Sequence, residues 1–299
     1  MKTCDVGEYK NCVELKSGNF TIAVSQDFGP RVIGGWIDGS DNIFHVMPPT
    51  PIKSVNTGFA LYGGHRLWIS PEITPRTYSP DNEKVNVETV TGGCKFEAKQ
   101  ESISGLQKTI TITKLNNNRF ALKHKITNCG QWDVTFACWA LSIMAPGGVA
   151  IIPQARDIKR DPFTPDRPLV LWPYTSIADK RLSLEDEYIL LRQDSKATSA
   201  TKIGFFTNDG WIAYVNSGVA LVKHIEWNKE VQNTFPDHGC NVESYSCKSF
   251  CEIETLSPLA TVKPGEAIIH TEIWQAIAGL PEIRDTKDIK KHLVPRLDF

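Results

Sequence analysis

Two glutamates separated by one residue could do chemistry together near the end of the chain. Glu252 and Glu254 lie in the segment FCEIETL, whose β-branched and apolar residues favour a strand. Because side chains alternate along a strand, both carboxylates project from one face, together with Phe250. Two such carboxylates repel unless a cation separates them or the pKa of one rises. The pair suits a general base or a cation site; we favour Glu254 as the base, with Glu252 as the alternative.

A second candidate site is the segment YGGHRLWISPE, residues 62–72, within a predicted loop at 56–82. The two glycines allow unusual backbone angles and close approach of a ligand, which makes His65 and Arg66 candidate site residues. The alternative is a structural arginine that ties the loop together. Long loops with many polar and charged side chains are often functional.

Further polar residues follow in the same loop, and others lie on predicted strands. The loop residues form a donor and acceptor set suited to sugar hydroxyls or a carboxylate, with hydrogen bonding inside the loop as the alternative. The candidate binding residues, besides Arg66 and Glu252, are Arg76, Tyr78, Asp81, Asn82, Glu243 and Trp68. Trp139 and Trp227 are further candidates for stacking, although tryptophans also fill cores.

Two short segments, HIEW and HTEIW, each place a histidine two residues before a glutamate. On a strand each pair shares one face, and a carboxylate beside a histidine can transfer protons. We keep His224 of the first pair as a candidate catalytic group. His270 and Glu272 of the second pair follow a turn, so we expect them on an exposed polar face.

The elements that must position these residues are predicted to be strands. Alternation of apolar and polar residues recurs at 20–25, 108–115 and 119–128, and turn residues separate such segments. The pattern predicts antiparallel sheets packed as a sandwich, in a single domain over 1–299. One helix is expected at 281–293, and surface loops are expected at 153–174 and 228–241.

Composition excludes several classes of function. The chain of 299 residues has a formal net charge of −1, which gives no basic field for nucleic acid or an anionic membrane. No apolar run approaches the length of a membrane span, and no signal peptide is predicted, so we expect a cytoplasmic protein. The eight cysteines are expected as free thiols. No metal or nucleotide motif occurs, so we expect no cofactor, with a cation at the acidic residues as the alternative.

Several segments together resemble a known superfamily. They include GPRVIGGW, YGGHRLWISPE with PRTYSPDN, ACWALSIMAPGG, FPDHGCNVESY and CEIETLSPLATVKPGEAIIHTEIW. They resemble bacterial proteins of the galactose mutarotase-like superfamily, which includes the aldose 1-epimerases. The resemblance implies a large all-β supersandwich with a sugar-binding cleft and a short C-terminal helix.

The resemblance also implies a chemistry. In epimerases of this superfamily a histidine acts as general acid on the ring oxygen, and a glutamate on a late strand, here matching Glu254, acts as general base. The central segment 137–148 contains no histidine, and Ile69 stands where the resemblance leads us to expect one. His65 and His224 are the candidate replacements. Ile69 also hints at a less hydrophilic ligand.

Three functions remain open at this point. The first is an acid/base enzyme that acts on a sugar or sugar-like ring. The second is a carbohydrate-binding protein without catalysis. The third is an isomerase, lyase or cyclase that acts on another ring-bearing metabolite, because one fold can host unrelated functions.

Overall fold

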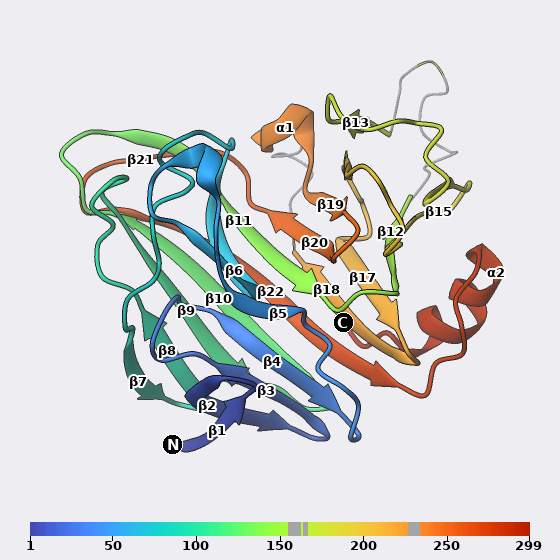
Figure 1. Cartoon of the computed structure of the whole chain (residues 1–299), viewed down its shortest axis with the longest axis horizontal. Coiled ribbons are helices and arrows are strands. Elements are labelled where there is room, and N and C mark those ends of the chain that lie inside the picture. The colour runs from blue at the N-terminus through green and yellow to red at the C-terminus, as the bar shows by residue number, and fades with distance from the viewer. Residues whose placement is uncertain (155–162, 164–166, 227–233) are drawn as a thin grey trace.

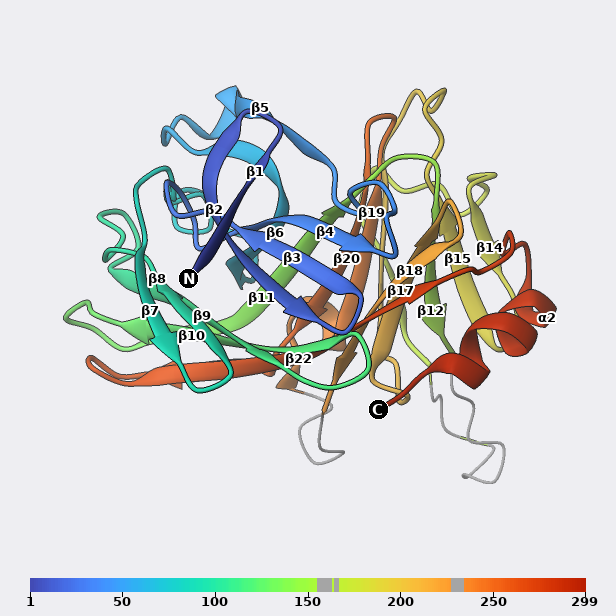
Figure 2. The ribbon, with the colours of Figure 1, turned by 90° about the horizontal axis from the view of Figure 1, so that it is seen from below.

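Two large antiparallel sheets pack face to face and form a twisted sandwich in the computed structural model (Figures 1 and 2). The structure describes residues 1–154, 163, 167–226 and 234–299. The N-terminal strands lie at one end of the sandwich and the C-terminal helix lies at the other. Apolar side chains from the facing sides of both sheets form the main core. The predicted all-β sandwich is therefore confirmed.

The first sheet places strands from distant parts of the chain side by side. Its order is β1 (Lys2–Val6), β2 (Tyr9–Ser17), β3 (Phe20–Val24), β4 (Val32–Ile37), β6 (Ala60–Ser70), β11 (Val134–Met144), β20 (Cys251–Leu256), β19 (Val242–Ser246), β16 (Thr201–Phe205) and β13 (Leu169–Leu171). Two further strands join it, with β5 (Val46–Pro51) on β6 and β21 (Ala260–Val262) on β11.

The second sheet covers one face of the first. Its order is β14 (Leu182–Leu184), β15 (Tyr188–Arg192), β12 (Val149–Pro153), β17 (Trp211–Asn216), β18 (Val219–Ile225), β22 (Ala267–Ala278), β10 (Arg119–Asn128), β9 (Leu106–Lys114), β8 (Gly93–Glu97) and β7 (Asn86–Val90). The predicted face of β10 is confirmed, since Phe120, Leu122, His124 and Ile126 are all buried.

Within the described residues, helix occurs only in short pieces. They are α1 (Pro236–Gly239), α2 (Thr286–Asp288) with continuing turns over Ile289–Leu293 and Val294–Arg296, and a turn at Lys53–Val55. The C-terminal helix begins later than predicted, because the side chain of Asp285 caps it by accepting from the Asp288 backbone N–H. Parts of the predicted loops 153–174 and 228–241 lie outside the described residues. No helix in the described ranges is long and apolar enough to cross a bilayer.

The loop predicted at 56–82 is wrong over its central part, because residues 60–70 form strand β6. Gly63 and Gly64 have positive φ angles of 81° and 68° within this strand. A Cβ atom at Gly63 would lie 2.0 Å from the carbonyl oxygen of His45, and one at Gly64 would lie 2.1 Å from that of Val32. The glycines thus allow neighbouring backbone to approach β6, rather than a ligand as we predicted.

The Gly64→Ala variant is expected to destabilise the protein strongly. A left-handed residue other than glycine costs about 1–3 kcal/mol, and the contact with the Val32 carbonyl adds to that cost. Gly92→Ala is the matched control, because Gly92 has a φ of 76° and no atom within 4 Å of its Cβ position. Urea unfolding of both variants measures the difference, and equal losses would contradict the importance of this contact.

Candidate functional site

Strand β6 directs its side chains to two different environments. Arg66 and Trp68 lie on the face turned away from the second sheet, where both line a cleft. His65 and Ile69 lie on the opposite face, between the sheets, and are buried. Adjacent residues of a strand must face opposite sides, so His65 and Arg66 cannot serve one site together.

The cleft has a volume of about 320 Å³, within the range of small-molecule sites. Tryptophan and tyrosine side chains form much of its wall, and Arg66, Lys202, Glu72 and Glu252 supply charge. Its lining residues are Ile52, Leu61, Arg66, Trp68, Glu72, Tyr78, Trp139, Leu141, Tyr174, Ala200, Lys202, Tyr245, Phe250 and Glu252. An aromatic wall with a few charged groups suits a ligand that has both an apolar face and hydroxyl groups.

Arg66 and Glu252 form the first charged pair of the cleft. Nη2 of Arg66 donates to Oε1 of Glu252 over 3.1 Å, and its guanidinium carbon lies 4.2 Å from the centre of the Trp68 ring. Burial raises the pKa of Glu252 above its ordinary value, and Glu254 adds to this rise, although Arg66 and Lys202 oppose it. Glu252 can therefore exchange a proton nearer to neutral pH than an exposed glutamate can.

Lys202, Glu254 and Glu243 form the second charged group. Nζ of Lys202 lies 3.0 Å from Oε2 of Glu254 and 2.7 Å from Oε2 of Glu243. Trp139 also donates to Oε2 of Glu254, over 2.7 Å. Burial lowers the pKa of Lys202, but the two carboxylates outweigh burial and raise it above its ordinary value. Lys202 therefore remains an ammonium ion.

The two glutamates of the predicted pair differ in exposure. Glu252 is 8% exposed and lines the cleft, whereas Glu254 is 0% exposed beneath Trp139 and Lys202. Both project from the same face of β20, as predicted, because Cys251, Ile253 and Thr255 occupy the other face. Of this pair, Glu252 is thus the carboxylate that a ligand can reach.

Buried polar atoms beside the cleft lack partners inside the protein. Within the described ranges, Nε and Nη1 of Arg66, Nε1 of Trp68 and Oε1 of Glu254 have no hydrogen-bond partner. Buried polar groups are usually paired, so such atoms in one place need an explanation. Arg66 and Trp68 both line the cleft, so these unpaired donors lie at its wall.

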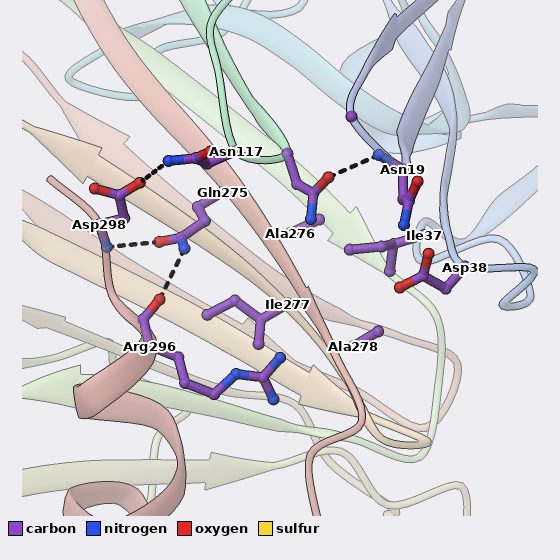
Figure 3. A pocket seen from close by; sticks show the side chains of 12 residues that line it. Asn19, Ile37, Asp38, Asn117, Gln275, Ala276, Ile277, Ala278, Arg296 and Asp298 are labelled. Atoms are coloured by element: carbon purple, nitrogen blue, oxygen red, sulfur yellow. Dashed lines mark hydrogen bonds between the residues drawn. The ribbon is translucent and has the colours of Figure 1, made fainter.

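A wider hollow of about 530 Å³ lies elsewhere, where the C-terminal segment crosses the ends of β10 and β22 (Figure 3). Several of its polar side chains bond to the C-terminal segment. Asn117 donates to Asp298 over 3.0 Å, while Gln275 accepts from the backbone N–H of Asp298 and donates to the carbonyl oxygen of Arg296. These bonds hold the chain terminus in place, and we assign no ligand to this hollow.

Comparison with solved structures identifies the architecture. The chain aligns with a candidate aldose 1-epimerase from Klebsiella pneumoniae at a TM-score of 0.58 and 10% identity, covering 97% of this chain and 84% of that one. A galactose mutarotase-like protein from Lactobacillus casei aligns at 0.55 and 8% identity, covering 89% and 100%. The chain has the galactose mutarotase-like fold. No protein-family model matches the sequence, and no curated protein matches it.

Several residues predicted for the site lie outside the cleft of this galactose mutarotase-like fold. Asp81 pairs with the buried Arg31, and Asn82 donates to the carbonyl oxygen of Gly58, so both serve the loop. Arg76 is partly exposed in the same loop and is not among the cleft residues. Tyr78 does line the cleft, where its hydroxyl donates to Glu72.

Neither predicted histidine reaches the cleft. His224 lies on β18 of the second sheet, where its ring stacks on Phe299 with a 4.2 Å separation of the ring centres. His65 is fully buried between the sheets. Ile69 also faces the core, so this residue carries no information about the polarity of a ligand. The expected exposed face at His270 and Glu272 is wrong as well, because both are buried.

One buried group has the composition of a metal site. Nε2 of His65 and Nε2 of His124 lie 2.8 Å apart, and each lies 4.0 Å from Oε2 of Glu272. That oxygen already accepts from Nε1 of Trp274 over 2.7 Å, and the Lys223 ammonium lies 2.8 Å from Oε1. A metal ion here would be repelled by Lys223, so we assign the group to hydrogen bonding.

Sequence reasoning missed Lys202, Glu72, Tyr174 and Tyr245 as cleft residues. Lys202 had a detectable signal, because it is a single charge within the otherwise apolar and small residues of TKIGF. A lysine in such a strand needs a buried counter-charge. Its two partners, Glu243 and Glu254, lie opposite each other on β19 and β20. The tyrosines had no such signal, since they belong to segments with ordinary alternation or to a loop.

Proposed function

We propose that the protein is an enzyme that binds a sugar or sugar-like ring in this cleft and interconverts its anomers by proton transfer. The observation that carries the proposal is the cleft carboxylate Glu252, paired with Arg66 beside the Trp68 ring and raised in pKa. The galactose mutarotase-like fold supports the proposal, because solved structures with this fold include a candidate aldose 1-epimerase from Escherichia coli K12. That structure aligns at a TM-score of 0.52 and 12% identity, covering 90% of this chain and 99% of that one.

The proposed reaction needs one group that accepts a proton and one that donates a proton. Glu252 takes the proton of the anomeric hydroxyl as the bond between the anomeric carbon and the ring oxygen breaks. Lys202 donates a hydrogen bond to the ring oxygen and protonates it as it becomes an alkoxide, a stronger base than an amine. Rotation of the aldehyde and reversal of both transfers close the ring in the other configuration and restore both side chains.

Arg66 is expected to set the pH at which the enzyme becomes active. Glu252 must be ionised to accept a proton, so activity falls as the pH drops through its raised pKa. Arg66 stabilises the ionised form, and its removal raises that pKa further. The Arg66→Met variant should therefore move the acid limb of the kcat/KM profile to higher pH. An unchanged limb, or a shift to lower pH, would contradict the assignment of Glu252.

A panel of freshly dissolved single anomers of neutral hexoses and pentoses tests the proposed function. The rate of anomer exchange, followed by NMR, should exceed the uncatalysed rate for at least one sugar. Thermal shift with the same panel reports binding independently of catalysis. Binding without exchange would overturn the proposal in favour of a carbohydrate-binding protein. Stabilisation only by a ring-bearing metabolite that is not a sugar would overturn it in favour of another isomerase, lyase or cyclase.

A further inference from the structure

A connected set of buried polar side chains lies between the sheets, directly behind the cleft. We name it the inter-sheet network. The first sheet contributes His65 on β6, Ser142 on β11 and Thr255 on β20; the second contributes His124 on β10, Lys223 on β18, and His270, Glu272 and Trp274 on β22. Each of these residues is at most 7% exposed. The proposed reaction uses none of them.

One arrangement of protons satisfies the histidine pair when both rings are neutral. Nδ1 of His124 faces the carbonyl oxygen of His270 at 3.1 Å, so this nitrogen carries the proton and Nε2 accepts. Nε2 of His65 must then donate to it over 2.8 Å, which leaves Nδ1 of His65 to accept from the Ser142 hydroxyl over 2.9 Å. Burial lowers the pKa of both histidines, in agreement with neutral rings.

The same reasoning fixes the protons around Glu272. Thr255 donates to Oε1 of Glu272 over 2.5 Å, and it accepts from Nε2 of His270 over 2.7 Å. Burial lowers the pKa of His270 to about 3, which keeps this ring neutral as well. Burial acts to raise the pKa of Glu272, but the Lys223 ammonium and its hydrogen bond oppose burial, and the pKa falls below its ordinary value. Burial also lowers the pKa of Lys223, but Glu272 opposes this effect, and their 2.8 Å contact pairs an ammonium ion with a carboxylate.

The inter-sheet network contacts the strands of the cleft next to the residues that line it or support it. His65, Ser142 and Thr255 are the sequence neighbours of Arg66, Leu141 and Glu254, whose side chains lie on the cleft side of the same strands. Nζ of Lys223 also donates to the carbonyl oxygens of Ala140 on β11 and Ile253 on β20, over 3.0 and 3.3 Å. One ammonium thus ties together the backbones of the two strands that carry Trp139 and the glutamate pair.

We propose that the inter-sheet network holds the cleft in its working geometry, with Lys223, His65 and Thr255 as positioning residues for Arg66 and the Glu252–Glu254 pair. The inference rests on the proposed function. His65, which the sequence suggested as an acid, acts here through its neighbour and touches no substrate. Since small misplacements of reacting groups cost much of a rate, loss of the network should reduce turnover more than binding.

The test compares two double variants, each of which removes one buried lysine–glutamate pair. Lys223→Met with Glu272→Gln removes the charges of the network. Lys108→Met with Glu101→Gln is the matched control, because that pair is also buried and has a 2.6 Å contact. In the described part of the chain, Nζ of Lys108 donates no hydrogen bond to β6, β11 or β20. The network variant should lose about 10–100-fold in kcat for anomer exchange with KM within about twofold, as supporting residues around other sites do. The control should keep the native kcat.

A second readout separates this inference from the proposed function. Hydrogen exchange should show lost protection at residues 64–67, 139–142 and 252–255 in the network variant only, whether or not a substrate is known. If the double variant does not fold, Ser142→Ala replaces it in the test. This small truncation should show the same loss of protection to a smaller extent. If the network and control variants had the same kcat and the same hydrogen-exchange pattern, the inference would be overturned. Absence of anomer exchange in the native protein would overturn the proposed function instead. The hydrogen-exchange comparison would then decide the inference about the network.

Discussion

Replacement of Glu252 with glutamine is expected to lower kcat for anomer exchange by about 10²–10⁴-fold, the usual contribution of a general acid or base. Glutamine keeps the shape of the side chain and can still accept from Nη2 of Arg66, so folding should persist. It cannot take up the proton of the anomeric hydroxyl. Exchange rates at saturating sugar, measured with a thermal melt of the same sample, separate loss of chemistry from loss of structure.

Glu254→Gln is the matched control for this prediction, since it makes the same chemical change two residues along the strand. Glu254 is fully buried, and its Oε2 atom accepts from Trp139 and Lys202. Its replacement should cost less than the Glu252 change, about tenfold, by weakening the hold on Lys202. If the Glu254 variant were inactive and the Glu252 variant active, the two glutamates would have to exchange roles.

The second large effect is expected from Lys223→Met, which should lower the free energy of unfolding by about 3–5 kcal/mol. The change leaves the Glu272 carboxylate buried without its cation, although Trp274 and Thr255 still donate to it. Adding Glu272→Gln should recover much of the loss, because the uncompensated charge disappears. Urea unfolding at pH 7 measures both variants. A loss below about 1 kcal/mol in the single variant would show that the pair carries little net energy.

The sequence predicted the sandwich well because strand periodicity is a local property. The alternation in 119–128 correctly placed Phe120, Leu122 and Ile126 in the core, and the spacing of Glu252 and Glu254 correctly placed both on one face. The segment 62–72 was misread for a physical reason. Glycines and polar residues made it look like a loop, whereas the glycines admit neighbouring backbone within a strand.

The content of the cleft could be predicted only in part. Arg66, Trp68, Tyr78 and Glu252 were foreseen and do line it. The exclusion of His65 follows from strand parity, which could not be applied while the segment was taken as a loop. The burial of His270 and Glu272 could not be predicted, because their partners come from distant strands and no local pattern reveals that pairing.

The order of strands in the first sheet has a consequence for how the protein folds. The cleft requires β6, β11 and β20 to lie side by side, although they come from the first quarter, the middle and the last fifth of the chain. Contacts between residues so distant in sequence close only after large losses of chain entropy, and proteins rich in them fold slowly. A nascent chain therefore cannot bind a ligand until its last strands have emerged, and ligand binding should be the last property to return on refolding.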